Sequence, residues 1–391
     1  MSASNRLFKQ SNRFPKYTPL PWPLYFRGIL AKDPVLWISA ALALASSIAV
    51  RPPLASYADY IDCKTLVCLA CLMAASGGFM LSGLFDRAAA RLVGACGSSR
   101  ALTSAMVAAT FFASMFVTND VALIVFVPMT LIAFKRAGCD PTLAVVLQTV
   151  AANVGSILLP MGNPQNLYLY SRYQMSFAPF FRTVLPLSLA GAAVLALFCL
   201  RMRKTPVNCP DSGKTPMRTR AIAFYSVLFL AAVLAVFDAL DYRIALAATV
   251  VSLFAKGRNL AQQIDYALLL TFVFFFVFVG NIANVPSINE ALTGMVGPRP
   301  YLAAIASSQI ISNVPAAVLL SRFTADGHAL LAGVSAGGCG TLIASMASLI
   351  SYKLFMRNGG ERSRYLLLFT LVNILFLVIM TLAYVASTAW R

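Results

Sequence analysis

The chain has 391 residues, of which 59% are hydrophobic and only 11% are charged, and its formal net charge is +18 at pH 7. A soluble domain carries about 25% charged residues, so this composition excludes an ordinary soluble protein and indicates a membrane protein. The basic excess does not indicate nucleic acid, because Lys and Arg lie in short segments between apolar runs, where they orient a membrane protein. The expected partners are therefore membrane lipid and a small substrate, and no nucleic acid.

In chain order, a basic lead-in over residues 1–34 is expected in the cytoplasm. Clear apolar spans of about the length that a bilayer requires follow at 35–50, 62–83, 183–200, 221–239, 242–255, 266–284 and 366–388. Other apolar regions, at 101–135, 141–171, 300–322 and 329–355, are interrupted by polar residues or glycine. Non-helical backbone at membrane depth is tolerated only where protein or water satisfies its polar groups. Each interruption is therefore a candidate functional site.

The distribution of charge predicts how the interrupted regions cross the membrane. If 101–135 and 300–322 are re-entrant and the N-terminus is inside, 23 of the 31 basic residues are cytoplasmic. If both regions cross once, 17 basic residues are cytoplasmic and 14 are external, so the positive-inside rule favours the first topology. Region 300–322 is too short for two spans, whereas 101–135 is either re-entrant or two short spans. We expect a multi-pass protein of the cell (inner) membrane, with a cytoplasmic N-terminus and an external C-terminus.

The same order of elements occurs twice. The first repeat, at 35–202, consists in order of a span, a span, a hairpin, a broken span and a span. Its hairpin lies at 101–135 and its broken helix at 141–171. A second repeat at 242–391 has its hairpin at 300–322 and its broken helix at 329–355. A cytoplasmic loop and one linking span at 203–241 join the repeats, so the second repeat has the opposite orientation in the membrane. The predicted fold is an all-α polytopic membrane protein of two inverted repeats, each with a re-entrant helical hairpin and a broken transmembrane helix. This arrangement is typical of secondary transporters.

The four interruptions resemble those of the ion transporter superfamily, which contains divalent anion/sodium symporters, citrate transporters and arsenite permeases. The resemblance covers roughly residues 35–390 and rests on Thr118-Asn119-Asp120-Val121-Ala122, Gly162-Asn163-Pro164-Gln165-Asn166, Ser312-Asn313-Val314-Pro315-Ala316 and Gly337 through Ile350. It implies an elevator-type transporter, usually a homodimer, in which the hairpins and broken helices move against the other spans. Asp120 and Val314 stand where the dicarboxylate branch has the last hydroxyl of Ser-Asn-Thr, so dicarboxylate specificity is not implied.

The expected site binds an anion without a buried cation, because no Lys or Arg is placed at the membrane midplane. Helix N-termini, amides and hydroxyls are then the available groups. The residues expected to bind substrate are Thr118, Asn119, Asn163, Pro164, Asn166, Ser312, Asn313 and Thr341. A coupling sodium ion requires oxygen ligands, for which the candidates are Asp120, Asn119, Gly162, Asn313, Gly337 and Gly338. No other metal and no cofactor is expected.

Several of these residues have a structural alternative. Asn119 and Asn313 could simply cap the second arm of each hairpin. Asp120 alone among the acidic residues lies deep in an apolar region, which makes it a candidate for cation or proton coupling, although it could also be an N-cap. Tyr168, Tyr170 and Tyr173 are interpreted as interfacial aromatic residues, with contact to substrate as the alternative.

The sequence therefore predicts a secondary active transporter of a small organic or inorganic anion, coupled to sodium or protons and working by an elevator mechanism. The alternatives are an efflux permease for arsenite-like oxyanions and a sodium/proton antiporter. An intramembrane enzyme is not favoured, because the sole histidine, His328, is expected in an external loop and no catalytic constellation lies at membrane depth.

Overall fold

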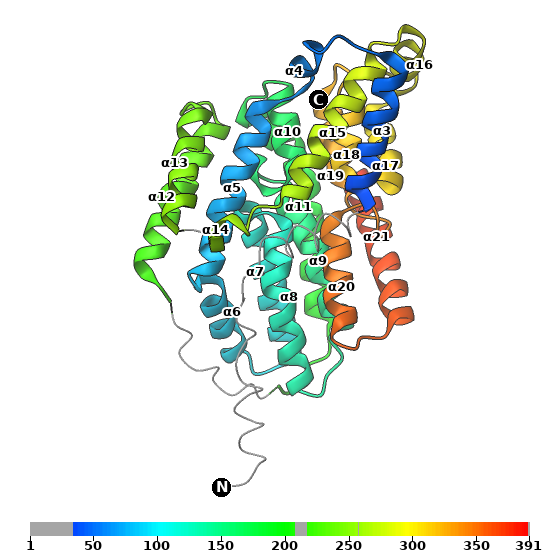
Figure 1. The fold of residues 1–391 in the computed structure, drawn as a ribbon. Helices are drawn as coiled ribbons and strands as arrows, with labels where there is room; N and C mark the ends of the chain where they lie inside the picture. Colours follow the sequence, from blue (N-terminus) through cyan, green and yellow to red (C-terminus); the bar gives the residue numbers. More distant parts are fainter. Residues whose placement is uncertain (1–33, 208–216, 257, 390–391) are drawn as a thin grey trace.

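The computed structural model describes residues 34–207, 217–256 and 258–389, so the predicted lead-in before residue 34 lies outside the described residues. The described chain is almost entirely helical (Figure 1). Within the described ranges, 6 helices are long and apolar enough to cross a membrane. They are α5 (Cys63–Leu81), α7 (Ser99–Val117), α11 (Phe177–Arg201), α12 (Thr219–Val236), α15 (Tyr266–Ala283) and α21 (Arg362–Ala389). This multi-pass helical architecture confirms the predicted fold class.

The helices follow the same order in the two halves of the chain. The first half contains α3 (Pro34–Val50), α4 (Ser56–Tyr60), α5, α6 (Leu84–Gly94), α7, α8 (Asn119–Arg136), α9 (Thr142–Ser156), α10 (Pro164–Arg172) and α11. After α12, the second half contains α13 (Tyr242–Lys256), α14 (Arg258–Ala261), α15, α16 (Pro286–Val296), α17 (Pro300–Ile311), α18 (Asn313–Leu320), α19 (Gly327–Gly337), α20 (Met346–Arg357) and α21. The hairpins are therefore α7–α8 and α17–α18, and the broken helices are α9–α10 and α19–α20.

Local backbone geometry also repeats between the halves. Thr118, at the tip of the first hairpin, has φ 74° and ψ 150°, and Ser312, at the tip of the second, has φ 74° and ψ 154°. A positive φ is uncommon for a residue other than glycine, so its occurrence at both tips marks the same turn. The helices α5 and α15 likewise begin at aspartate N-caps, Asp62 and Asp265, whose carboxylates accept from a backbone N–H three residues later. The repeats thus share local structure as well as element order.

The first hairpin is re-entrant, although α7 is long enough to cross a membrane. At its tip, the amide Nδ2 of Asn119 lies 3.4 Å from Oδ1 of Asn153, and Nδ2 of Asn153 donates to the Gly338 carbonyl at 3.2 Å. The tip therefore meets the interrupted part of α19–α20. The far end of the molecule lies beyond it, where α10 ends and the Tyr173 hydroxyl donates to the carbonyl of Thr324 at 2.9 Å. The charge pattern could not decide this point, because a hairpin and two short spans leave the chain on the same side.

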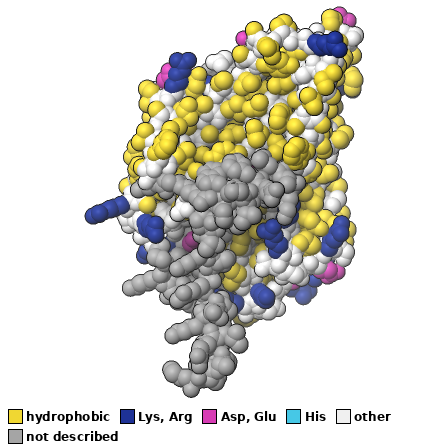
Figure 2. Space-filling model, viewed as in Figure 1, with side chains coloured by type: hydrophobic (Ala, Val, Ile, Leu, Met, Phe, Trp, Pro, Cys, Tyr) yellow, Lys and Arg dark blue, Asp and Glu magenta, His cyan; other side chains and the backbone are white. Residues whose placement is uncertain are grey.

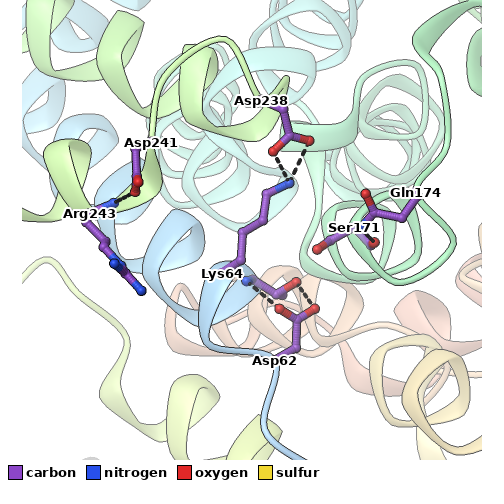
Figure 3. A network of polar contacts seen from close by, with 8 residues as sticks. Asp62, Lys64, Ser171, Gln174, Asp238, Asp241 and Arg243 are labelled. Carbon is purple, nitrogen blue, oxygen red and sulfur yellow. Dashed lines mark hydrogen bonds and ion pairs between the residues drawn. The ribbon is translucent and has the colours of Figure 1, made fainter. Parts of the chain in front are cut away.

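Hydrogen bonds and ion pairs show which loops lie together at each end of the molecule. At one end, Arg364 pairs with Asp140 at 2.8 Å, between the start of α21 and the turn after α8. At the opposite end, Nζ of Lys64 lies 2.7 Å from a carboxylate oxygen of Asp238, which joins α5 to the end of α12 (Figure 3). Between the ends, one face of the molecule is broadly hydrophobic, with Lys and Arg side chains gathered toward its lower part (Figure 2).

The helices pack as two groups. What we call the scaffold group contains α3 alongside α15 and α5 against α12 and α13. What we call the hairpin group contains both hairpins, both broken helices, α11 and α21. The family resemblance implied that α11 and α21 lie with the scaffold, but the structure packs them against each other and against α9. The reason is that every residue of α9 from Ala144 onward is buried, so this helix must be covered on all sides.

Two smaller expectations were wrong. Tyr168 and Tyr170 are 2% and 7% exposed, so they are packed inside the protein and are not interfacial. Tyr168 packs its ring against Phe272 and Phe276 of α15, and its hydroxyl pairs with the hydroxyl of Ser321 at 2.8 Å. His328 lies in the first turn of α19 and not in a loop.

Candidate functional site

The side-chain amide of Asn153, near the end of α9, connects the two repeats. Its Oδ1 accepts a hydrogen bond from the hydroxyl of Ser345 at 3.0 Å and lies 3.4 Å from Nδ2 of Asn119. Its Nδ2 donates to the Gly338 carbonyl at 3.2 Å. Because Asn153 is 5% exposed, these contacts are buried. One side chain therefore holds together the first hairpin tip, the second break and the N-cap of α20.

The first hairpin tip presents Asn119 and Asp120. Thr118 is the N-cap position of α8 but makes no side-chain cap bond. Oδ1 of Asn119 accepts from the backbone N–H of Asp120 at 3.0 Å, while its Nδ2 points to Asn153. Asn119 is therefore not simply an N-cap of α8, since it also contacts another helix.

Asp120 is in the first turn of α8 and is not the N-cap. Its Oδ1 is buried, and within the described residues this atom has no hydrogen-bond partner. A buried acceptor without a partner is costly unless something binds there. This geometry does not fit the capping alternative and leaves a carboxylate oxygen available for a cation or a proton.

In the first break, a short 3₁₀ turn (Pro160–Gly162) separates α9 from α10. Asn163 caps α10, because its Oδ1 accepts from the backbone N–H of Asn166 at 3.0 Å, and Pro164 occupies the first helical turn. The Asn163 Nδ2 donates to the Ser156 hydroxyl at 3.1 Å, and that hydroxyl donates to the Asn153 carbonyl at 3.0 Å. The N-terminus of α10 is thereby linked to Asn153.

The amide of Asn166 turns toward its own break. Its Nδ2 donates to the carbonyl of Ile157 at 3.0 Å, and the residue is fully buried. Gly162 lies so close to Ser156 that an added Cβ would be 2.1 Å from the Ser156 carbonyl oxygen. Asn166 and Gly162 therefore stabilise the interrupted backbone, and their expected contacts with substrate or cation stay predictions.

The second hairpin tip is bound directly to the second break. The backbone N–H of Asn313 donates to the carbonyl of Ala344 at 2.9 Å, and the Ser312 hydroxyl lies 3.4 Å from the same oxygen. Nδ2 of Asn313 lies over Gly338, where an added Cβ would approach it to 2.8 Å. Gly337 in turn lies against Ser308, where an added Cβ would be 2.8 Å from the hydroxyl oxygen. Both glycines therefore permit close packing of the hairpin on the break.

The N-termini of four helices converge through these contacts. They are the N-termini of α8, α10, α18 and α20, which begin at Asn119, Pro164, Asn313 and Met346. Each N-terminus carries a partial positive charge from its first backbone N–H groups. The N–H groups of Asp120, Asn166 and Asn313 already donate to acceptors within the protein. Together with the amides and hydroxyls around Asn153, the four N-termini form a polar centre within a hydrophobic protein that is suited to an anion.

Sequence reasoning missed two residues of this centre, Asn153 and Gln309. The carboxamide of Gln309, on α17, makes hydrogen bonds with the carbonyls of Gly337 and Cys339 and with the backbone N–H of Thr341. Each lies in a mostly apolar helix and outside the four quoted motifs. The available signal was the cost of burying an amide, which requires hydrogen-bond partners.

The comparisons with known proteins agree with this arrangement. A family model described as citrate transporter matches residues 29–328. An uncharacterized transporter of Methanocaldococcus jannaschii is 33% identical over 287 residues, which are 72% of this chain and 78% of that protein. The inner membrane protein YbiR of Escherichia coli is 32% identical over 315 residues, 76% of this chain and 82% of that protein.

A more partial likeness and a solved structure complete the comparison. The silicon efflux transporter LSI3 of Oryza sativa is 31% identical over 144 residues, 36% of this chain and 29% of that protein. The YdaH transporter of Alcanivorax borkumensis, described as having an unusual topology, superposes with a TM-score of 0.56 at 14% identity and covers 85% of this chain and 86% of that one. The shared fold, the relatives and the matching family model all point to a transporter and not to an enzyme. The chain belongs to the citrate transporter family.

Proposed function

We propose that this protein is a secondary active transporter of a small organic or inorganic anion, coupled to sodium or protons. The observation that carries the proposal is the convergence of four helix N-termini and the Asn153 amide on one buried centre. Backbone N–H groups at helix N-termini bind anions, and broken helices at the midplane of inverted repeats form transporter sites. Membership of the citrate transporter family supports a carboxylate or a comparable anion as substrate.

The packing of the helices supports an elevator movement. The long-range side-chain bonds named above join members of one group, such as Lys64 to Asp238 in the scaffold group and Asn153 to Ser345 in the hairpin group. The contact of Tyr168 with Phe272 and Phe276, by contrast, joins the two groups through aromatic rings. Apolar contacts are non-directional, so they can exchange during sliding at lower cost than hydrogen bonds. The hairpin group would carry the polar centre across the membrane as one body.

Coupling is assigned to Asp120. Its partnerless buried Oδ1 lies one residue from Asn119, so a bound cation or proton would change the charge beside the substrate. A carboxylate inside a membrane protein is costly and is a functional candidate by default. We also propose that the protein is a homodimer of the inner membrane, with the N-terminus inside and the C-terminus outside.

A second candidate function is efflux of a small oxyanion or of its neutral acid. Its specific support is the partial likeness to the silicon efflux transporter LSI3, which spans 144 residues. The same polar centre would serve this function, because hydroxyls and amides also bind uncharged acids. The two functions differ in direction and in substrate, which transport assays separate.

Transport by purified protein in liposomes tests the proposal. Uptake and efflux of citrate, other carboxylates and small oxyanions would be measured with a sodium gradient, with a proton gradient and with neither. We expect concentrative transport of at least one anion that requires one of the gradients. The Asn119→Ala, Asn313→Ala double variant is the control, because it removes both hairpin-tip amides and should be inactive. Gradient-independent behaviour identical to that of the control for every solute would overturn the proposal.

A further inference from the structure

The side chain of Gln309 closes the backbone of the second break. Its Nε2 donates to the carbonyls of Gly337 at 2.9 Å and Cys339 at 3.2 Å, and its Oε1 accepts from the backbone N–H of Thr341 at 2.8 Å. The Thr341 hydroxyl donates to the Gln309 carbonyl at 3.0 Å. An interrupted helix leaves such backbone groups without helical partners. One side chain of hairpin α17–α18 therefore supplies partners for three backbone groups of this interruption.

Gly340 makes room for this contact. Its φ of 123° is a conformation that other residues rarely adopt, and an added Cβ would lie 2.1 Å from Oε1 of Gln309. Glycine is thus required at 340 both for the backbone and for the docked carboxamide. Gly340 thus leaves the space in the break that the Gln309 side chain occupies.

Among the residues that the structure describes, the first hairpin has no equivalent contact. Ser114 and Ser308 each stand five residues before the tip asparagine, so Met115 occupies the position that Gln309 has in the second repeat. Methionine has no N–H donor and is only a weak acceptor. The hairpin packs against α9 and α20, but the hydrogen bond from the side chain of its tip residue Asn119 to another helix is the 3.4 Å contact with Asn153, which is near the limit for a hydrogen bond.

We infer that Gln309 is a positioning residue that fixes hairpin α17–α18 to the α19–α20 break as one rigid half of the site. The tip of α7–α8 is then the part that opens to admit and release the substrate. This inference deepens the proposed function and rests on it for the role of the opening. The contacts themselves are tested without any transport measurement.

The native Cys339 is a reporter of the second half, because it lies in the break and is 0% exposed. The full chain would be reconstituted with Cys339 as its only cysteine, and its alkylation by N-ethylmaleimide would be timed. We expect Gln309→Met to accelerate labelling about tenfold or more, because buried hydrogen bonds that oppose local opening are lost. Met115→Gln, the reciprocal change in the first hairpin, should leave the rate unchanged. Equal labelling rates with and without Gln309→Met would overturn the role of Gln309.

A second measurement keeps Gln309 and compares the two tips. In a cysteine-free chain, Thr118→Cys and Ser312→Cys place one thiol at each matched tip position. We expect the cysteine at 118 to be alkylated about tenfold faster or more, since fewer hydrogen bonds hold that tip. Equal rates, or faster labelling at 312, would refute the assignment of α7–α8 as the opening part. Neither result depends on a known substrate, so it remains distinguishable from failure of the proposed function.

Discussion

Replacing Asn153 with alanine tests whether this amide holds the two repeats together. The change removes the partner of the Gly338 carbonyl at 3.2 Å, of the Ser345 hydroxyl at 3.0 Å and of the Asn119 amide at 3.4 Å. These groups come from the second break, the N-cap of α20 and the first hairpin tip. We expect transport to be lost while the helices stay inserted.

The magnitude follows from the mobility of the three partners. A buried polar group without a partner costs roughly 1–3 kcal/mol. The Gly338 carbonyl is fixed by the backbone and takes the full penalty, whereas the Ser345 hydroxyl can rotate and the Asn119 contact is already long. A total of about 2–4 kcal/mol is therefore reasonable, and it corresponds to a population of the assembled site lower by about thirtyfold to a thousandfold.

The second repeat provides a matched control. Gly155 and Gly337 lie against Ser114 and Ser308, respectively, and this match places Ser335 at the position of Asn153. The Ser335 hydroxyl is buried, and among the described residues its Oγ has no hydrogen-bond partner. Ser335→Ala should then preserve transport and thermal stability in detergent, whereas Asn153→Ala lowers both. Similar values for the two variants, in liposome transport and in thermal unfolding, would refute the proposed role of Asn153.

Three further predictions concern the tips and the topology. Asn119→Ala and Asn313→Ala should each reduce liposome transport by more than about tenfold with normal size-exclusion profiles, because each removes a tip amide; wild-type rates would show that both are structural. Asp120→Asn keeps the size but not the charge, so concentrative uptake should collapse while exchange survives, and unchanged cation dependence would rule out coupling through Asp120. An impermeant thiol reagent should label a cysteine at Asp326 but not at Arg203 in intact cells, and the reverse pattern would invert the topology.

The interruptions could be predicted from the sequence because polar residues, glycine and proline are rare in apolar runs. The tips at Thr118 and Ser312 and the break that begins after Gly337 lie where these residues predict them. The second break extends further, to the N-cap Ser345, because the Gln309 contacts hold Thr341 out of a helix. Helix length could not reveal that α7 is an arm of a hairpin, because α7 is long enough to cross a membrane. The position of the tip follows from tertiary contacts, such as that of Asn119 with Asn153.

Side-chain direction within the site could not be predicted. Asn166 belongs to a motif with Asn163, yet its amide satisfies the carbonyl of Ile157 in its own break. Gln309 belongs to no motif, yet it lies inside the second break. A sequence motif fixes where the backbone is interrupted, whereas the fold decides which amide reaches the freed carbonyls.

The differences between matched positions explain how two similar halves can do different work. Both tips adopt the same turn at Thr118 and Ser312, so the backbone of the site is close to symmetric. Where the first repeat has Asp120, the second has Val314, so a carboxylate is present at one tip only. If both tips were equally fixed, the buried centre would have no opening. If both were equally free, the substrate could enter or leave past either tip. In the proposed mechanism, a charged, weakly held tip opposite an uncharged, firmly held one would place coupling and opening on the same hairpin. Neutralising the carboxylate would then regulate release.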